Sequence, residues 1–199
     1  MAKKTLEKVF ISEADQYLFA QGTHYDIYKK LGAHVSEENG EKGVYFAVWA
    51  PNAKYVHVIG NFNQWNEFSH QMKRLGPGGI HSLFVPGLGE GEIYKFLIET
   101  PDGRKLYKAD PFGNSAEYRP GTASKTADIS NIKWTDEKWV SARAKKNWEE
   151  EPIAIYECHI GMAQDEEKVG TYIEFKDKVL PRIAADGYNC IQIMAIAEH

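Results

Sequence analysis

The sequence predicts a mainly β protein, in which an antiparallel β-sandwich precedes a βαβ unit. Short β-branched and aromatic runs between residues 43 and 110 are separated by Gly and Pro clusters, as in sandwich domains. Two apolar runs, 153–160 and 189–197, enclose a helical stretch long enough for a parallel crossover. The 199 residues leave room for one ordinary domain and part of another.

The first 35 residues are expected to form an N-terminal helical extension. Ser12 fits a helix N-cap, and Asp15 three residues later is the acidic partner of a weak capping box. Gly22 ends this first helix, and a second turn-rich stretch ends at Gly32.

The sandwich itself is expected over residues 36–125. Its predicted strands are rich in β-branched and aromatic residues and end at turn signals: Val44–Ala50, Tyr55–Gly60, Ile80–Val85 and Glu92–Glu99. The last strand leads into a hairpin signal at Pro101-Asp102-Gly103. Alternation along the strands sends about half of their side chains inward. Six strand aromatics could suggest a sugar-binding platform, but most of the six are expected in the core: Tyr45, Phe46, Trp49, Phe84, Tyr94 and Phe96.

A linker is expected over residues 126–152, with a helix rich in lysine and glutamate inside it. The βαβ unit follows over residues 153–199. Thr171 opens its helix with a capping box, and Gly187 closes it. Pro181 interrupts the helical pattern, so a kink or a restart is expected just before it.

Composition and charge argue against several function classes. The chain has 24 Lys and Arg against 28 Asp and Glu, and its net charge of −4 gives no electrostatic case for binding nucleic acid or an anionic membrane. No apolar run approaches the roughly 20 residues of a membrane span. The basic start, Met1–Glu7, lacks the apolar core of a secretory signal. Cys158 and Cys190 are expected to be buried free thiols in a reducing cytoplasm, without the spacing of a metal site.

Motifs follow one known order along almost the whole chain: Leu18–His24, Phe46–Ala53, Gly60–Asn66, Asp110-Pro111, Tyr156–Met162 and Gly187–Ile196. The first four resemble the amino-terminal module, CBM48, of glycogen (1,4-alpha-glucan) branching enzymes. The last two resemble the first two strands of the catalytic (β/α)8 barrel in that group of glycoside hydrolase family 13. The resemblance implies an immunoglobulin-like β-sandwich of CBM48 type, followed by the truncated start of a (β/α)8 barrel.

This resemblance implies that the chain is the N-terminal fragment of a branching enzyme. Such an enzyme moves an α-1,4-glucan segment into an α-1,6 linkage in glycogen biosynthesis, with no metal or organic cofactor. A (β/α)8 barrel needs about 250 residues. The family's nucleophilic aspartate, acid/base glutamate and transition-state-stabilising aspartate come from later strands, so the chain has no catalytic residue by resemblance. We expect it to be inactive alone.

Three other functions are compatible with parts of the sequence. A stand-alone α-glucan-binding module would not need the apolar strands after residue 152. A fragment of a related debranching hydrolase is disfavoured by the run Tyr156–Met162 and by the long entry Gly22–His34. The sequence does not exclude a non-catalytic scaffold.

The resemblance also implies three glucan-binding residues. Trp65 matches an aromatic platform for the apolar face of a sugar, although it would equally serve to pin its loop. Lys95 matches a lysine that binds sugar hydroxyls, and a surface lysine is the simpler interpretation. Tyr107 lies about where related modules carry a second aromatic residue, but its hairpin is longer than theirs. The alternative role for the module is to pack against the barrel, so the sequence leaves its function open between binding and support.

Three further residues end the two strands of the barrel start: His159, Glu198 and His199. The carboxyl ends of barrel strands face the active site, so in the parent these residues would lie near the substrate. A core position is the more ordinary role for His159. The expected partners are glycogen or another α-1,4-glucan, with no nucleic acid and no membrane. Self-association is expected through the uncovered barrel strands.

Overall fold

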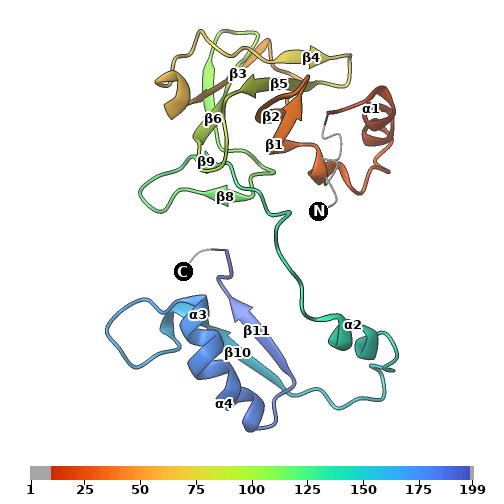
Figure 1. Ribbon diagram of the computed structural model, residues 1–199, viewed down its shortest axis with the longest axis vertical. Coiled ribbons are helices and arrows are strands. Elements are labelled where there is room, and N and C mark those ends of the chain that lie inside the picture. The colour runs from red at the N-terminus through yellow and green to blue at the C-terminus, as the bar shows by residue number, and fades with distance from the viewer. Residues whose placement is uncertain (1–9, 198–199) are drawn as a thin grey trace. The chain divides into compact units, whose positions relative to one another are not determined.

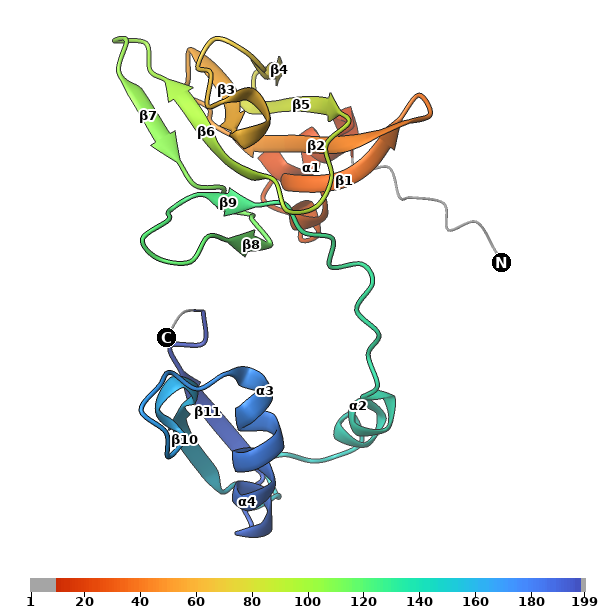
Figure 2. The same cartoon turned by 60° about the vertical axis from the view of Figure 1, so that its left-hand side comes forward.

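The computed structural model describes residues 10–197 and contains two compact units, residues 1–133 and 134–199. Figure 1 labels the elements of both units, and Figure 2 shows them from a second direction. The two units are described separately below. In the described part of the chain, no helix is long and apolar enough to cross a membrane.

The first unit is an antiparallel sandwich of two sheets, as the sequence predicts. One sheet has the strand order β1-β2-β5-β4, and the other has the order β3-β6-β9-β8, with β7 also paired to β6. The strand bounds are β1 Gly32–Glu38, β2 Glu41–Trp49, β3 Tyr55–Gly60, β4 Lys73–Leu75, β5 Ile80–Pro86, β6 Ile93–Glu99, β7 Lys105–Lys108, β8 Ser115–Ala116 and β9 Ser124–Lys125. The helices are α1 Glu13–Ala20 and the short 3-10 turns η1 Ile27–Lys29 and η2 Asn61–Asn63.

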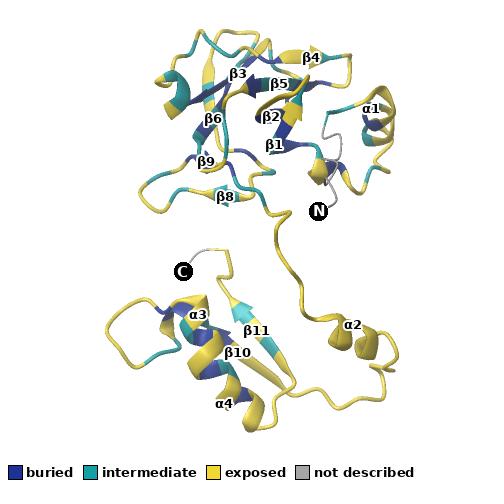
Figure 3. Cartoon of the chain, in the orientation of Figure 1, coloured by how far each residue is buried: buried dark blue, intermediate teal, exposed yellow. Residues whose placement is uncertain are grey.

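The main core lies between the two sheets (Figure 3). Alternate residues of β2 and β6 face each other there, including Phe46, Val48, Tyr94 and Phe96. Burial of such side chains contributes about 1.5–3 kcal/mol each. The intervening residues of β2 are buried as well, because a second cluster packs on the opposite face of the first sheet.

The N-terminal segment supplies this second cluster. Phe19 of α1, Ile27 of η1 and Leu31 pack against Tyr45 and Ala47 of β2. The first sheet is therefore covered on both faces. The segment expected to be helical up to residue 35 already enters β1 at residue 32, because β1 pairs with β2 along its whole length.

A buried charge cluster fixes α1. Ser12 and Asp15 form the expected capping box. The Asp15 carboxylate also accepts hydrogen bonds from Lys30 Nζ at 2.6 Å and His24 Nε2 at 2.8 Å. Burial raises the pKa of Asp15, but these hydrogen bonds outweigh it and hold the pKa well below its ordinary value.

A second buried contact joins strand β6 to the segment that follows β7. The Tyr94 hydroxyl donates to Asp110 Oδ2 at 2.5 Å, and Asp110 Oδ1 accepts from the Phe112 backbone N–H at 2.8 Å. Burial raises the pKa of Asp110 and of Tyr94. The Asp110-Pro111 motif thus has a structural role at the exit from β7.

The second unit is a βαβ unit with parallel strands, as predicted. Its elements are α2 Glu137–Arg143, β10 Ile155–His159, η3 Ile160–Met162, α3 Tyr172–Glu174, η4 Phe175–Val179, α4 Leu180–Ala185 and β11 Cys190–Met194. The predicted capping box at Thr171 is present. Pro181 lies in the first turn of α4, directly after the π-helical segment η4, so the helix restarts where the sequence predicted.

Within the described residues of the second unit, the helices cover one face of this parallel pair. Ile191 and Ile193 pack toward Phe175 and Ile183 of the helices. The other face of β11 carries Cys190, which is exposed. The expectation of two buried thiols is therefore wrong for Cys190, because it alternates away from the helical layer, and right for Cys158. The expected self-association through these strands stays a prediction.

Candidate functional site

The outer face of the second sheet presents the predicted glucan-binding side chains. Tyr94 and Phe96 face the core, so Lys95 and Leu97 lie on the opposite face of β6, where Lys95 is half-buried and Leu97 is buried. Tyr107 of β7 pairs with Leu97 and shares its face. Lys95 and Tyr107 are thus diagonal neighbours on adjacent strands, a spacing of about 7–8 Å between Cα atoms. The described part of the N-terminal segment, from residue 10 onward, packs its helix on the first sheet and not on this one.

The loop after β3, residues 61–71, carries Trp65. Its η2 turn contacts both β3 and β6. The Trp65 indole N–H donates to Asn61 Oδ1 at 2.9 Å, and the Trp65 ring is 38% exposed. Asn61 therefore orients the ring. Trp65 keeps an accessible surface while its loop contacts hold it in place.

Asn63 organises this loop from inside. Its side-chain oxygen accepts from the Gly60 N–H at 2.9 Å, and its amide donates to the Val58 carbonyl at 3.0 Å. The amide also lies 3.0 Å from both Ser69 Oγ and His70 Nδ1. These contacts hold the loop in a fixed shape.

Glu67 connects the Trp65 loop to strand β7. Its carboxylate accepts a hydrogen bond from the Tyr107 hydroxyl. It also forms an ion pair with Lys105, whose Nζ lies 2.5 Å from Glu67 Oε2. The hydrogen bonds from Lys105 and Tyr107 lower the pKa of Glu67, and the same contacts raise the pKa of each partner. Through this contact the loop that carries Trp65 lies against Tyr107 of β7.

Lys95 has its own partner on this face. Its Nζ donates to Thr122 Oγ1 at 2.6 Å, from the loop between β8 and β9. The Thr122 hydroxyl holds the ammonium in place without neutralising it. A hydroxyl-rich ligand can exchange with such a contact, because sugar hydroxyls offer the same acceptor chemistry.

Three partners on this face were not found from the sequence: Asn61, Glu67 and Thr122. Asn61 precedes Trp65 by four residues, and its capping chemistry was the available signal. The contact between Glu67 and Tyr107 joins positions 40 residues apart. It depends on the register of β7 and therefore has no local signature in the sequence.

The residues predicted near the parent's active site belong to the second unit. His159 ends β10 and is half-buried. Glu198 and His199 lie outside the described residues. Within residues 10–197, no three His, Cys, Asp or Glu side chains are grouped so as to hold a metal ion.

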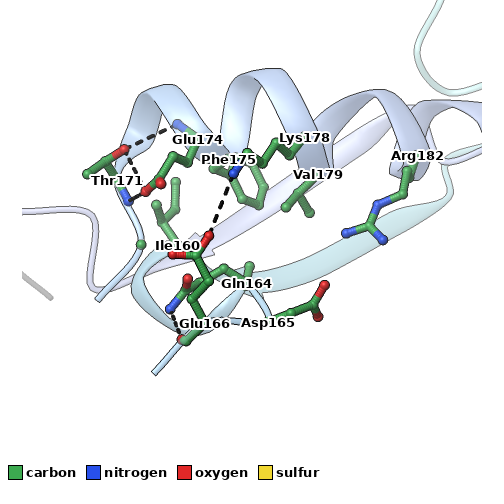
Figure 4. Close-up of a pocket in the computed structure, with 12 residues that line it drawn as sticks. Ile160, Gln164, Asp165, Glu166, Thr171, Glu174, Phe175, Lys178, Val179 and Arg182 are labelled. Carbon is green, nitrogen blue, oxygen red and sulfur yellow. Dashed lines mark hydrogen bonds and ion pairs between the residues drawn. The ribbon is translucent and has the colours of Figure 1, made fainter. Parts of the chain in front are cut away.

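The second unit also has a pocket of about 310 Å³ between the loop after β10 and the following helix (Figure 4). Its walls mix acidic side chains, such as Asp165 and Glu166, with Lys178 and Arg182. The Lys178 ammonium lies 4.0 Å from Glu166. This mixture favours neither an anion nor a cation, and no predicted site residue with a described position lines the pocket.

The two-sheet architecture and this outer face define the class of the first unit. Residues 30–113 match the family model of carbohydrate-binding module 48, the isoamylase N-terminal domain. Solved structures support the fold. A putative α-amylase from Salmonella typhimurium superimposes with a TM-score of 0.58 at 24% identity, covering 82% of this chain and 24% of that chain. The maltotriose complex of a PulA G680L mutant from Klebsiella pneumoniae gives a TM-score of 0.58 at 20% identity, covering 82% and 20%.

Among sequence relatives, the match is to one kind of enzyme. The chain is 56% identical over 198 residues to the 1,4-alpha-glucan branching enzyme GlgB of Butyrivibrio fibrisolvens, covering 97% of this chain and 31% of the relative. It is 44% identical to GlgB of Synechococcus sp. (strain JA-2-3B'a(2-13)), covering 98% and 28%. The chain thus matches the N-terminal region of these branching enzymes and spans less than a third of their length.

Proposed function

We propose that this chain is the N-terminal part of a 1,4-alpha-glucan branching enzyme, and that its sandwich binds α-glucan on the outer face of the second sheet. The observation that carries the binding proposal is the common face of Lys95, Tyr107 and the Trp65 loop. Aromatic rings suit the C–H face of a sugar, and an ammonium and a phenol suit its hydroxyls. The names of the relatives supply the substrate class.

Replacing Trp65 with alanine should weaken binding of maltoheptaose and glycogen about tenfold or more, because a buttressed, partly exposed aromatic ring is removed from the site. Isothermal titration calorimetry on the purified chain measures this change. Trp139→Ala is the matched control, since Trp139 is a 57% exposed tryptophan of the second unit and should leave affinity unchanged.

Wild-type affinity in Trp65→Ala would contradict the binding proposal. Failure of the folded wild-type chain to bind either glucan would also contradict it. The module would then serve to support the catalytic barrel of the parent, the alternative role considered from the sequence.

We also propose that this chain does not branch glucan by itself. The family resemblance assigns all three catalytic carboxylates to later barrel strands, and the second unit holds two parallel strands. Amylose incubated with the purified chain should keep its iodine absorption spectrum, whereas the complete GlgB of Butyrivibrio fibrisolvens should change it. A spectral shift produced by this chain would contradict the proposal. A cytoplasmic location also stays a prediction.

A further inference from the structure

We propose that Phe68 forms an additional stacking position for an α-glucan, next to the surface made by Trp65, Lys95 and Tyr107. This inference rests on the glucan-binding function proposed above. It assigns to the site a longer stretch of sugar chain than those three residues would hold.

The exposure of Phe68 is the first observation. Its side chain is 86% exposed, against 38% for Trp65 and 49% for Tyr107. A large apolar side chain this exposed, beside other exposed rings on one face, is typical of a binding surface. The Lys105 ammonium lies 5.2 Å from the centre of the Phe68 ring.

The loop presents Phe68 in a fixed conformation. The Phe68 N–H donates to Asn66 Oδ1 at 2.9 Å. Three other residues of the loop, Gln64, Trp65 and His70, have φ angles of 54°, 59° and 56°. Non-glycine residues rarely adopt this left-handed region, and they keep it where the surrounding contacts over-determine it. A preformed loop loses little conformational entropy when a ligand binds.

The register of β6 and β7 gives the direction of the extended site. Lys105 pairs with Glu99, and Tyr107 pairs with Leu97. Lys95, Tyr107 and Lys105 therefore occupy successive rows of the outer face, about 7 Å apart along the strands. Phe68 lies beside the Lys105 row, so a chain that contacts Lys95 and Tyr107 reaches Phe68 as it continues toward the β6–β7 turn.

The local charge identifies the occupant as a neutral one. Glu67 and Lys105 pair at 2.5 Å, so this end of the face has no unpaired charge from that pair to attract an ion. Both groups keep further hydrogen-bonding capacity, since a carboxylate accepts several hydrogen bonds and an ammonium donates three. An uncharged polyol with an apolar face fits this surface, and the next glucose units of the same α-glucan meet that description.

The test compares two sugars of different length. Isothermal titration calorimetry with maltotriose and with maltoheptaose is run on the whole chain carrying Phe68→Ala, Phe68→Trp, Trp65→Ala or Tyr25→Ala. Tyr25 is the matched control, because its aromatic ring is 85% exposed and belongs to the segment that covers the first sheet. Phe68→Ala is expected to lower the affinity for maltoheptaose about five- to tenfold and that for maltotriose less than twofold. Phe68→Trp and Tyr25→Ala are expected to retain wild-type affinity for both sugars.

The other possible results would contradict either the role of Phe68 or the proposed glucan binding. Wild-type affinity of Phe68→Ala for maltoheptaose, with binding lost in Trp65→Ala, would overturn the role of Phe68 and leave the proposed function standing. Equal losses for the two sugars in Phe68→Ala would also overturn it, because they would show a disturbed loop and not a lost contact. Unchanged binding in Trp65→Ala would overturn the proposed function itself.

Discussion

Replacing Gly79 with alanine is expected to destabilise the first unit by about 4 kcal/mol. Gly79 has a φ of +85°, and a Cβ placed there would lie 2.3 Å from the Cα of Pro51. The backbone of the turn before β5 thus passes directly against the turn after β2. Its position is fixed by the Ala50 N–H, which donates to the Gly79 carbonyl at 2.8 Å. Neither backbone can move aside without breaking this contact.

Two other glycines separate the cost of the positive φ from the cost of the steric clash with Pro51. Gly78 has open space around it and no left-handed φ, so Gly78→Ala should change stability by less than about 0.5 kcal/mol. Gly87 has a φ of +78° but open space, and Gly87→Ala should cost about 1 kcal/mol. Hydrogen exchange of the β2 amides under increasing urea measures the opening free energy of the first unit. Equal stability of Gly79→Ala and Gly78→Ala would show that the close approach to Pro51 is absent.

Replacing Asp15 with asparagine is expected to destabilise the first unit by about 3 kcal/mol at pH 7. The substitution removes the negative charge that accepts hydrogen bonds from Lys30, His24 and Ser12 in a site where Asp15 is 8% exposed. Lys30 would be left partly buried beside a neutral amide. Asp26→Asn is the matched control, because the Asp26 side chain is 64% exposed and pairs only on the surface with Lys29.

The destabilisation by Asp15→Asn is expected to depend on pH in a defined direction. The pKa of Asp15 is lower in the folded chain than its unfolded value of about 3.9, so the unfolded state binds the proton more tightly. The stabilisation by Asp15 is complete above this value and is lost as the pH falls below about 4. The difference between wild type and Asp15→Asn should therefore shrink in that range in urea unfolding. A difference that stays constant down to pH 2 would contradict the charge-based explanation.

The contribution of Asp110 to stability changes with pH in the opposite direction to that of Asp15. Burial raises its pKa, so its contribution is greatest at low pH and decreases as the pH rises past about 4. Because Asp15 and Asp110 oppose each other, the acid limb of the wild-type profile understates the effect of either group. The comparison with Asp15→Asn removes this ambiguity, since Asp110 is present in both proteins.

The central strands and the face of Lys95 could be predicted because they depend on local alternation. β2, β3, β5 and β6 all occur where apolar and aromatic runs predicted strands. The first four residues of β1, Gly32, Ala33, His34 and Val35, fall within the range predicted as the helical extension. The pairing of β1 with β2 decides its conformation, and tertiary pairing of this kind overrides local propensity.

The rest of the candidate site depends on contacts between distant segments. Trp65 and Tyr107 could be named from motif order, but the ion pair and hydrogen bond through Glu67 could not. They require the loop after β3 to meet a strand that begins 38 residues later, at Lys105. The exposure of Phe68 had no sequence signal either, because an aromatic residue in a loop next to a strand is equally compatible with a core position.

The position of the main core along the chain has a consequence for synthesis. The buried residues between the two sheets run from Ala33 to Phe96. A ribosome adds about 5–20 residues per second, so this whole set emerges within about 3–13 s. The sandwich can close while β10 and β11 are still untranslated. The apolar strands of the sandwich are then buried before the parallel pair β10 and β11 is synthesised, so the two sets of strands are exposed at different times during translation.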